Sequence, residues 1–176
     1  MGGMNSLYLE TGAEIAGLDA LVTQHFGPLA VKGPSSARYQ SFSGWFVKNY
    51  AGFGATLAAF SAQVPCDVVL FAYQSTVDAF AFFRCRGGTV VRALVFGCGD
   101  AEGEWELAEG APEEWELPMM FSEAELTGLL EYAESDAERE LLRARWETLA
   151  LEAGDFSPRP PDPHGLAAYL EFPDYG

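Results

Sequence analysis

The stretch between Val68 and Phe96 constrains the fold more than any other part of this chain. It holds three runs rich in β-branched and aromatic residues, Val68–Tyr73, Ala79–Arg86 and Val90–Phe96, separated by short polar or glycine breaks. Such runs are typical of β-strands. The short breaks predict an antiparallel meander, in which Gly87-Gly88 forms a two-residue hairpin turn.

Counting residue pairs outward from this turn assigns the hairpin side chains to two faces. One face is predicted to hold Ala79, Ala81, Phe83, Val90, Leu94 and Phe96, and the other Phe80, Phe82, Val91, Ala93 and Val95. A sheet that is apolar on both faces is normally covered on both. We therefore expect helices on one face and further chain on the other. The predicted fold class is α+β, with a mainly antiparallel sheet.

Periodicity and helix-ending residues predict the elements that precede the meander. We expect strands at Leu7–Glu10, Leu29–Val31 and Tyr39–Tyr50, and helices at Ile15–Phe26 and Ala55–Ala62. The residues that follow the two helices, Gly27-Pro28 and Pro65, are typical of helix C-termini.

A four-residue pattern occurs twice after the meander. Glu104-Trp105-Glu106-Leu107 is repeated ten residues later as Glu114-Trp115-Glu116-Leu117. Alternation of apolar residues with glutamate is typical of strands that have one solvated face. The two copies are therefore predicted to pair as a hairpin, with Trp105 close to Trp115.

A long acidic amphipathic helix is predicted near the C-terminus. Ser122 is suited to be its N-cap, and Glu125 lies three residues later, as in a capping box. Ser135-Asp136 resembles a second start signal. This leaves open a division into two helices, Glu123–Glu134 and Asp136–Leu151.

The end of the chain is dense in proline. Residues 157–165 contain four prolines among nine residues, which disfavours a regular helix or a central strand and predicts an extended segment. The apolar residues that follow it, Leu166, Tyr169, Leu170 and Phe172, favour a strap that docks on the core. We expect a single domain over 1–155 and a strap over 156–176. Docking on a second subunit, in a homo-oligomer, gives the same sequence pattern.

The negative charge is concentrated in one segment. Residues 100–155 carry 18 acidic residues against three arginines, in a chain whose net charge is −16. Such a segment attracts cationic partners and repels nucleic acid and anionic lipid. No apolar run approaches the roughly 18 residues of a membrane span, and no export signal is evident, so we expect cytoplasmic residence.

No residue pattern identifies a reaction, a cofactor or a metal site. The two histidines, His25 and His164, lie 139 residues apart, and Cys66, Cys85 and Cys98 lack the spacing of a zinc site or a disulfide framework. Ser43-Gly44 lacks the preceding glycine of a nucleophile elbow. The sequence therefore favours a protein that is not an enzyme.

The charge distribution leads to one functional hypothesis, a non-catalytic interaction protein that binds a basic partner, for example a cationic toxin that it neutralises. Aromatic anchors within a charged rim are typical of binding hot spots. The candidate partner-binding residues are Trp105, Trp115, Glu104, Glu106, Glu114 and Glu116.

An alternative is a module that binds a small ligand or a phosphoryl group, or an enzyme without a recognisable motif. A glycine turn that enters a helix can bind phosphate through backbone N–H groups. Gly52 and Gly54 stand at such a turn, although Leu57 occupies the place of a third glycine. The candidate cleft residues are Lys48, Gly52, Gly54, Tyr39, Tyr73 and Asp78.

Overall fold

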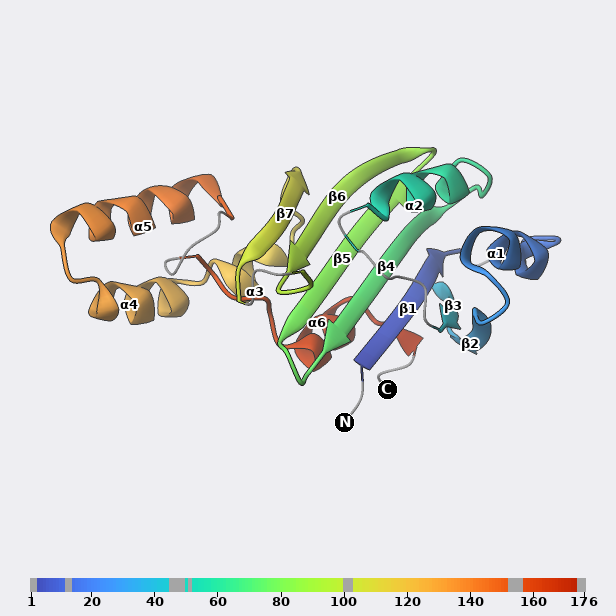
Figure 1. Ribbon diagram of the computed structural model, residues 1–176, viewed down its shortest axis with the longest axis horizontal. Helices are drawn as coiled ribbons and strands as arrows, with labels where there is room; N and C mark the ends of the chain where they lie inside the picture. Colours follow the sequence, from blue (N-terminus) through green and yellow to red (C-terminus); the bar gives the residue numbers. More distant parts are fainter. Residues whose placement is uncertain are drawn as a thin grey trace.

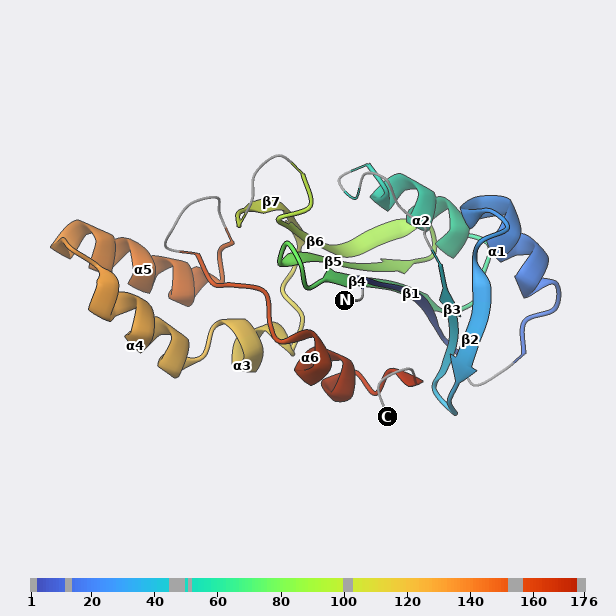
Figure 2. The ribbon, with the colours of Figure 1, turned by 60° about the horizontal axis from the view of Figure 1, so that its bottom comes forward.

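A seven-stranded antiparallel sheet runs through the molecule, and helices lie against both of its faces (Figures 1 and 2). The computed structural model describes residues 3–11, 14–44, 50, 52–99, 103–151 and 157–173. The strand order is β2-β3-β1-β4-β5-β6-β7. This confirms the predicted α+β class. The strands are β1 (Gly3–Glu10), β2 (Val31–Ser35), β3 (Tyr39–Ser43), β4 (Asp67–Gln74), β5 (Ala79–Arg86), β6 (Thr89–Phe96) and β7 (Trp105–Gly110).

The helices fall into three groups around the sheet. Two of them, α1 (Leu18–Phe26) and α2 (Gly54–Ser61), cover one face. The short helices α3 (Glu116–Met120) and α6 (Pro163–Tyr169) lie on the other face (Figure 2). The remaining two, α4 (Glu123–Tyr132) and α5 (Asp136–Thr148), form a helical hairpin that extends away from the sheet (Figure 1).

Each face of the sheet has its own apolar cluster. The cluster under α1 and α2 is largely aliphatic, with Phe42, Phe60 and Phe83 among its buried residues. The cluster on the opposite face is rich in aromatic rings, and the Phe172 ring stacks on Tyr8 with centroids 3.7 Å apart. The C-terminal segment thus closes the second face of the sheet, where its apolar residues Leu166, Leu170 and Phe172 dock on the core.

A β-bulge in β6 changes which side chains lie on each face. Cys85 pairs with Val90, but the next pair is Arg84 with Arg92, so Val91 has no partner in β5. One extra residue moves every later side chain to the other face. Leu94 and Phe96 accordingly join the aromatic cluster, and Ala93 and Val95 join the aliphatic one. The predicted face assignment beyond Val90 was therefore wrong.

The bulge depends on a glycine in the neighbouring strand. Gly110 pairs with Arg92 and has φ +85°, and a Cβ atom there would overlap the Val91 carbonyl oxygen. In the tight turn, Gly87 also has a positive φ, +54°, but its Cβ would meet nothing within 4 Å. Both glycines have a positive φ, and they differ mainly in that only at Gly110 would a Cβ atom overlap a neighbouring carbonyl oxygen.

Gly110→Ala is therefore expected to lower the free energy of unfolding by at least about 2 kcal/mol, because backbone strain and the overlap add. Gly87→Ala, the matched control, should lose about 1 kcal/mol from strain alone. Urea denaturation of both variants measures the difference. Equal losses would show that the contact with Val91 is unimportant.

The predicted long helix is divided into two, at the second start signal. Ser122 accepts a hydrogen bond from the Glu125 backbone N–H and caps α4. The complete capping box belongs to α5, where Ser135 and Glu138 each accept from the other's backbone N–H. The helix α5 ends at Thr148, before the predicted end at Leu151.

Two other expectations near the C-terminus were wrong. Glu114–Leu117 forms no strand, because Trp115 is the N-cap of α3, and β7 pairs with β6. The proline-dense segment is extended only as far as Asp162, whose side chain caps α6. Proline is well suited to the first turn of a helix, where its missing N–H has no intrahelical partner. Pro163 takes that place.

The N-terminal elements occur in the predicted order with altered bounds. The first strand begins earlier than Leu7, and the first helix begins at Leu18 instead of Ile15. The strand expected over Tyr39–Tyr50 ends at Ser43, and residues 45–49 lie outside the described part of the chain.

Candidate functional site

The two tryptophans predicted to anchor a partner are buried. Trp105 is 5% exposed and Trp115 1%. The indole N–H of Trp105 donates to the Pro158 carbonyl oxygen at 2.7 Å, and that of Trp115 donates to Glu113 Oε2 at 3.0 Å. Their polar atoms are thus satisfied inside the protein. The expectation of exposed aromatic anchors at these positions was wrong.

Glu116 is also buried, in an ion pair with Arg92. Arg92 Nε and Nη2 donate to the two carboxylate oxygens of Glu116 at 2.8 and 2.5 Å. Arg92 Nη1 donates to the Gly110 carbonyl oxygen at 2.8 Å. Neither side chain is more than 4% exposed. A buried charge needs such a partner, so Glu116 is not available to another protein.

A second arginine lies directly opposite Arg92 in the sheet. Arg84 pairs with Arg92 in the β5–β6 register, and like charges so placed repel. Arg84 Nε and Nη2 donate to the Glu113 carboxylate at 2.5 and 3.2 Å. The segment between β7 and α3 therefore supplies Glu113 to Arg84, and the first residue of α3, Glu116, pairs with Arg92. Part of the acidic segment compensates internal charge.

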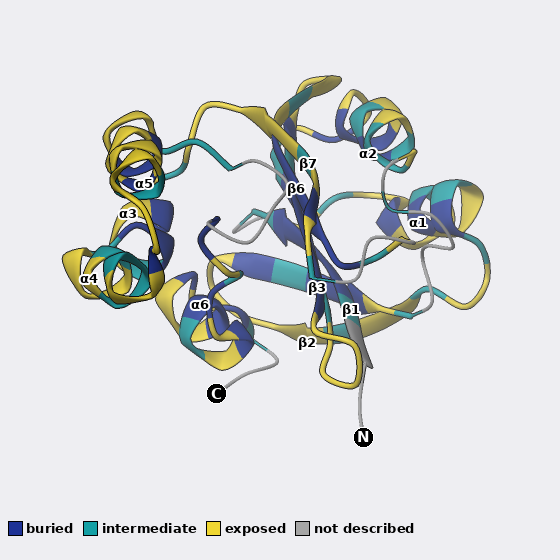
Figure 3. Ribbon diagram, turned by 60° about the vertical axis from the view of Figure 1, so that its left-hand side comes forward, coloured by how far each residue is buried: buried dark blue, intermediate teal, exposed yellow. Residues whose placement is uncertain are grey.

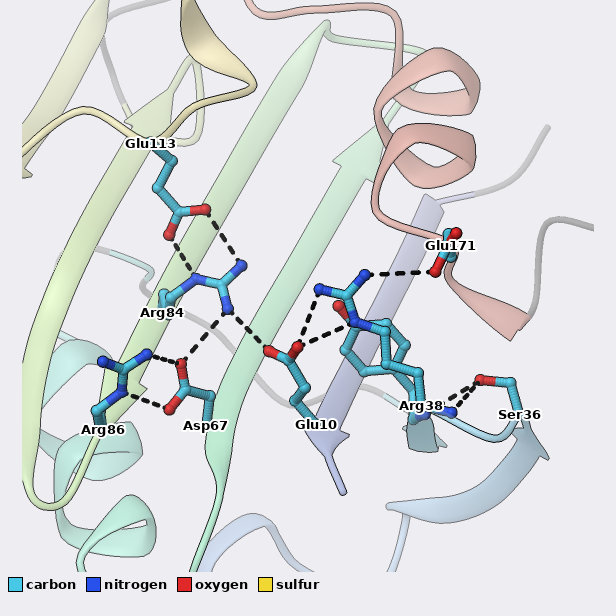
Figure 4. A network of polar contacts seen from close by, with 9 residues as sticks. Glu10, Ser36, Arg38, Asp67, Arg84, Arg86, Glu113 and Glu171 are labelled. Carbon is cyan, nitrogen blue, oxygen red and sulfur yellow. Dashed lines mark hydrogen bonds and ion pairs between the residues drawn. The ribbon is translucent and has the colours of Figure 1, made fainter. Parts of the chain in front are cut away.

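Arg84 also joins a wider ionic network at this end of the sheet (Figure 4). It lies 3.2 Å from Glu10 Oε2 and 3.6 Å from Asp67 Oδ2. The Arg86 guanidinium donates twice to Asp67 at 2.6 Å and lowers the pKa of that carboxyl. Arg38 connects Glu10 with the C-terminal segment through Glu171. The network joins β1, β4 and β5 to the segment between β7 and α3, through Glu113, and to the C-terminal segment, through Glu171.

The other candidate glutamates are at the surface. Glu104 and Glu114 are exposed, and Glu106 is exposed as a residue while its Oε1 accepts from the Cys98 and Gly99 backbone N–H groups at 2.5 and 2.6 Å. The six candidate partner-binding residues therefore do not form one surface.

The α4–α5 pair carries a larger set of exposed carboxylates, and we call residues 123–148 the acidic hairpin. Its surface is largely exposed (Figure 3). Tyr132 lies at the end of α4 and is 79% exposed, the highest value among the large hydrophobic side chains of the described residues. The exposed acidic residues of the hairpin are Glu123, Glu125, Glu131, Glu134, Asp136, Glu140 and Glu147.

The predicted ligand cleft is not one site. Gly54 begins α2 and packs toward Val90 and Phe83, in the aliphatic cluster. Tyr39 is buried in the aromatic cluster on the opposite face, where its ring contacts Phe172. Gly52 is in an exposed turn, and Lys48 lies outside the described residues. The sheet therefore separates the glycine turn from Tyr39.

Two of the predicted cleft residues do line a cavity, at another place. Tyr73 and Asp78 border a cavity of about 460 Å³ between the sheet and residues 159–163. We call it the strap cavity. Phe96 borders it from the end of β6, and Arg159 and Asp162 from the proline-rich segment. No sequence motif brings these residues together.

The surroundings of the three cysteines make their thiols unreactive. All three are free thiols, and burial raises the pKa of Cys85 to about 12 and the pKa values of Cys66 and Cys98 to about 11. A thiol with so high a pKa is not ionised near neutral pH and is a weak nucleophile.

Residues 3–11, 14–44, 50, 52–99, 103–151 and 157–173 hold neither a cluster of metal ligands nor a membrane-spanning helix. Nowhere in those ranges do three His, Cys, Asp or Glu side chains come together as ligands for a metal ion. In the same part of the chain, every helix is too short or too polar to cross a bilayer.

The chain was also compared with known proteins. Comparison with protein-family models, with curated proteins and with solved structures finds no match to this sequence or fold.

Proposed function

We propose that the protein is a non-catalytic interaction protein and that its acidic hairpin binds a protein with a basic surface, such as a cationic nuclease or toxin. The observation that carries the proposal is a set of exposed carboxylates around an exposed tyrosine on a projecting element; among the described residues, only Asp136 of this set forms an ion pair. The proposal includes cytoplasmic residence, which the three free thiols support, because disulfides are rare in reducing compartments.

The charge of the hairpin supports this choice of surface. Within the described residues, Asp136 is the one carboxylate of the hairpin in an ion pair, with Arg139 at 3.2 Å. Glu138 is used for capping, and Arg145 is buried. The remaining exposed acids are free to attract cations. By contrast, Glu113 and Glu116 already neutralise arginines of the sheet.

The position of Tyr132 supports an anchoring role. Tyrosine is enriched in binding hot spots, since it buries a large rigid ring while its hydroxyl finds a partner. Tyr132 is flanked in sequence by Glu131 and Glu134, so an apolar contact lies within a charged rim. Tyr132 thus takes the anchoring role that the sequence analysis assigned to Trp105 and Trp115, both of which are buried.

The test compares two variants with the same change in net charge. Glu131→Gln, Glu134→Gln and Glu140→Gln together neutralise the hairpin, whereas Glu104→Gln, Glu109→Gln and Glu114→Gln neutralise exposed acids near β7. Each is used as bait in a native lysate at low and high salt. Basic proteins should bind the wild type and the β7 variant at low salt, and salt should release them. The hairpin variant should lose them.

Tyr132→Ala should weaken any such complex about tenfold or more without unfolding the protein, because the side chain is exposed. Binding measured by calorimetry with the retained protein gives the ratio. Equal retention by the two charge variants, with an unchanged affinity for Tyr132→Ala, would refute the proposal.

A further inference from the structure

The strap cavity is built by three parts of the chain that are distant in sequence. Tyr73 and Asp78 flank the β4–β5 turn, Phe96 ends β6, and Arg159 lies in the extended segment before α6. Its volume of about 460 Å³ is within the usual range for small-molecule sites. The cavity is on the aromatic face of the sheet, away from the acidic hairpin's tip.

The charged groups around the cavity are opposite in sign and do not pair with one another. Within the described chain, neither Asp78 nor Arg159 forms an ion pair or a hydrogen bond. Arg159 is held instead over the Phe96 ring, with Cζ 5.6 Å from the centroid. Both side chains are exposed, so a molecule in the cavity can reach them.

The third charged group has a structural task. Asp162 Oδ2 accepts a hydrogen bond from the Gly165 backbone N–H at 2.6 Å and caps α6. The carboxylate still adds negative potential to the cavity. Two carboxylates against one guanidinium disfavour a purely anionic ligand, and a ligand that carries both charges can pair with each kind of group.

Apolar side chains also line the cavity, beside the charged groups. The rings of Tyr73 and Phe96 form one side, and prolines at 160, 161 and 163 form the other. Rings and prolines are rigid, so a ligand orders them at little entropic cost. Such walls fit an aliphatic or aromatic group carried beside two opposite charges.

We propose that the strap cavity binds a small zwitterionic ligand, an apolar amino acid or dipeptide, with its ammonium group at Asp78 and its carboxylate at Arg159. This inference is independent of the proposed function of the acidic hairpin. The apolar side chain of the ligand lies between the aromatic rings and the prolines.

Titration with four probes tests the proposal on the full chain. L-phenylalanine and the dipeptide Leu-Phe carry both charges, N-acetyl-L-phenylalanine lacks the ammonium group, and L-phenylalanine amide lacks the carboxylate. Calorimetry and amide NMR spectra should show binding of the zwitterions. Each blocked compound should bind about tenfold or more weakly than L-phenylalanine, because each lacks one charge-assisted contact.

Two variants assign the contacts. Asp78→Asn should weaken L-phenylalanine and its amide about tenfold and leave the N-acetyl compound unchanged. Arg159→Gln should weaken L-phenylalanine and the N-acetyl compound and leave the amide unchanged. Asparagine tolerates the positive φ of +50° at Asp78, so this variant retains the turn.

Arg143→Gln, an exposed change on α5, is the control and should bind like the wild type. The proposal is overturned if neither zwitterion binds at millimolar concentration. It is equally overturned if the blocked compounds bind as well as the zwitterions, or if both cavity variants bind like the control.

Discussion

Glu116→Ala is expected to lower the free energy of unfolding by about 3–5 kcal/mol, the usual cost of removing one partner of a buried ion pair. The change leaves the Arg92 guanidinium buried beside Arg84 without its carboxylate. It also removes the acceptor of the Glu113 backbone N–H, which donates to Glu116 Oε1 at 2.9 Å. Urea denaturation measures the loss.

Two further variants separate this effect from a general loss of charge. Glu114→Ala removes an exposed neighbour and should change stability by no more than about 0.5 kcal/mol. Combining Arg92→Met with Glu116→Leu removes both charges and should be less destabilising than Glu116→Ala alone, because no buried charge remains. If Glu116→Ala and Glu114→Ala are alike, the buried pair does not stabilise the fold.

Trp115→Ala should cost about 3–5 kcal/mol of unfolding free energy, as is usual for truncation of a buried aromatic side chain. The Trp115 ring packs edge-on against Phe82 with centroids 5.2 Å apart, and its N–H holds Glu113. Losing it opens a void and releases the carboxylate that pairs with Arg84. Chemical denaturation followed by circular dichroism measures the effect.

Trp115→Phe and Tyr132→Ala serve as controls for this variant. The phenylalanine retains most of the packing but not the N–H, so its loss should be intermediate. Tyr132→Ala should be close to the wild type in stability, since that side chain is 79% exposed. If Trp115→Ala is as stable as the wild type, the Trp115 ring does not stabilise the core, which contradicts this prediction.

Local sequence patterns predicted the meander and the starts of α4 and α5 well. Periodicity identifies β5 at its observed bounds, Ala79–Arg86, and the Ser135 and Glu138 pair marks the start of α5. These signals depend on neighbouring residues only. The bulge at Val91 depends on Gly110, which lies in a different strand, so counting from the turn missed it.

The candidate partner site was mistaken for a related reason. Glutamates that alternate with tryptophan predict a solvated face only if no cation lies opposite them. Arg84 and Arg92 are such cations, but counting from the turn sets Arg92 opposite Phe83. Only the bulge brings the two arginines opposite each other, where they need carboxylates from elsewhere. Which carboxylates do so depends on tertiary contacts.

The pairing of Arg92 with Glu116 limits how the sequence can change during evolution. A single substitution at either position leaves a charge in the interior, so the two are expected to change together or not at all. Exposed carboxylates on the acidic hairpin do not neutralise a buried charge, so each can change without leaving a charge unpaired in the core. Divergence among descendants of this sequence would therefore accumulate on the hairpin, where recognition of a new partner could arise without loss of the fold.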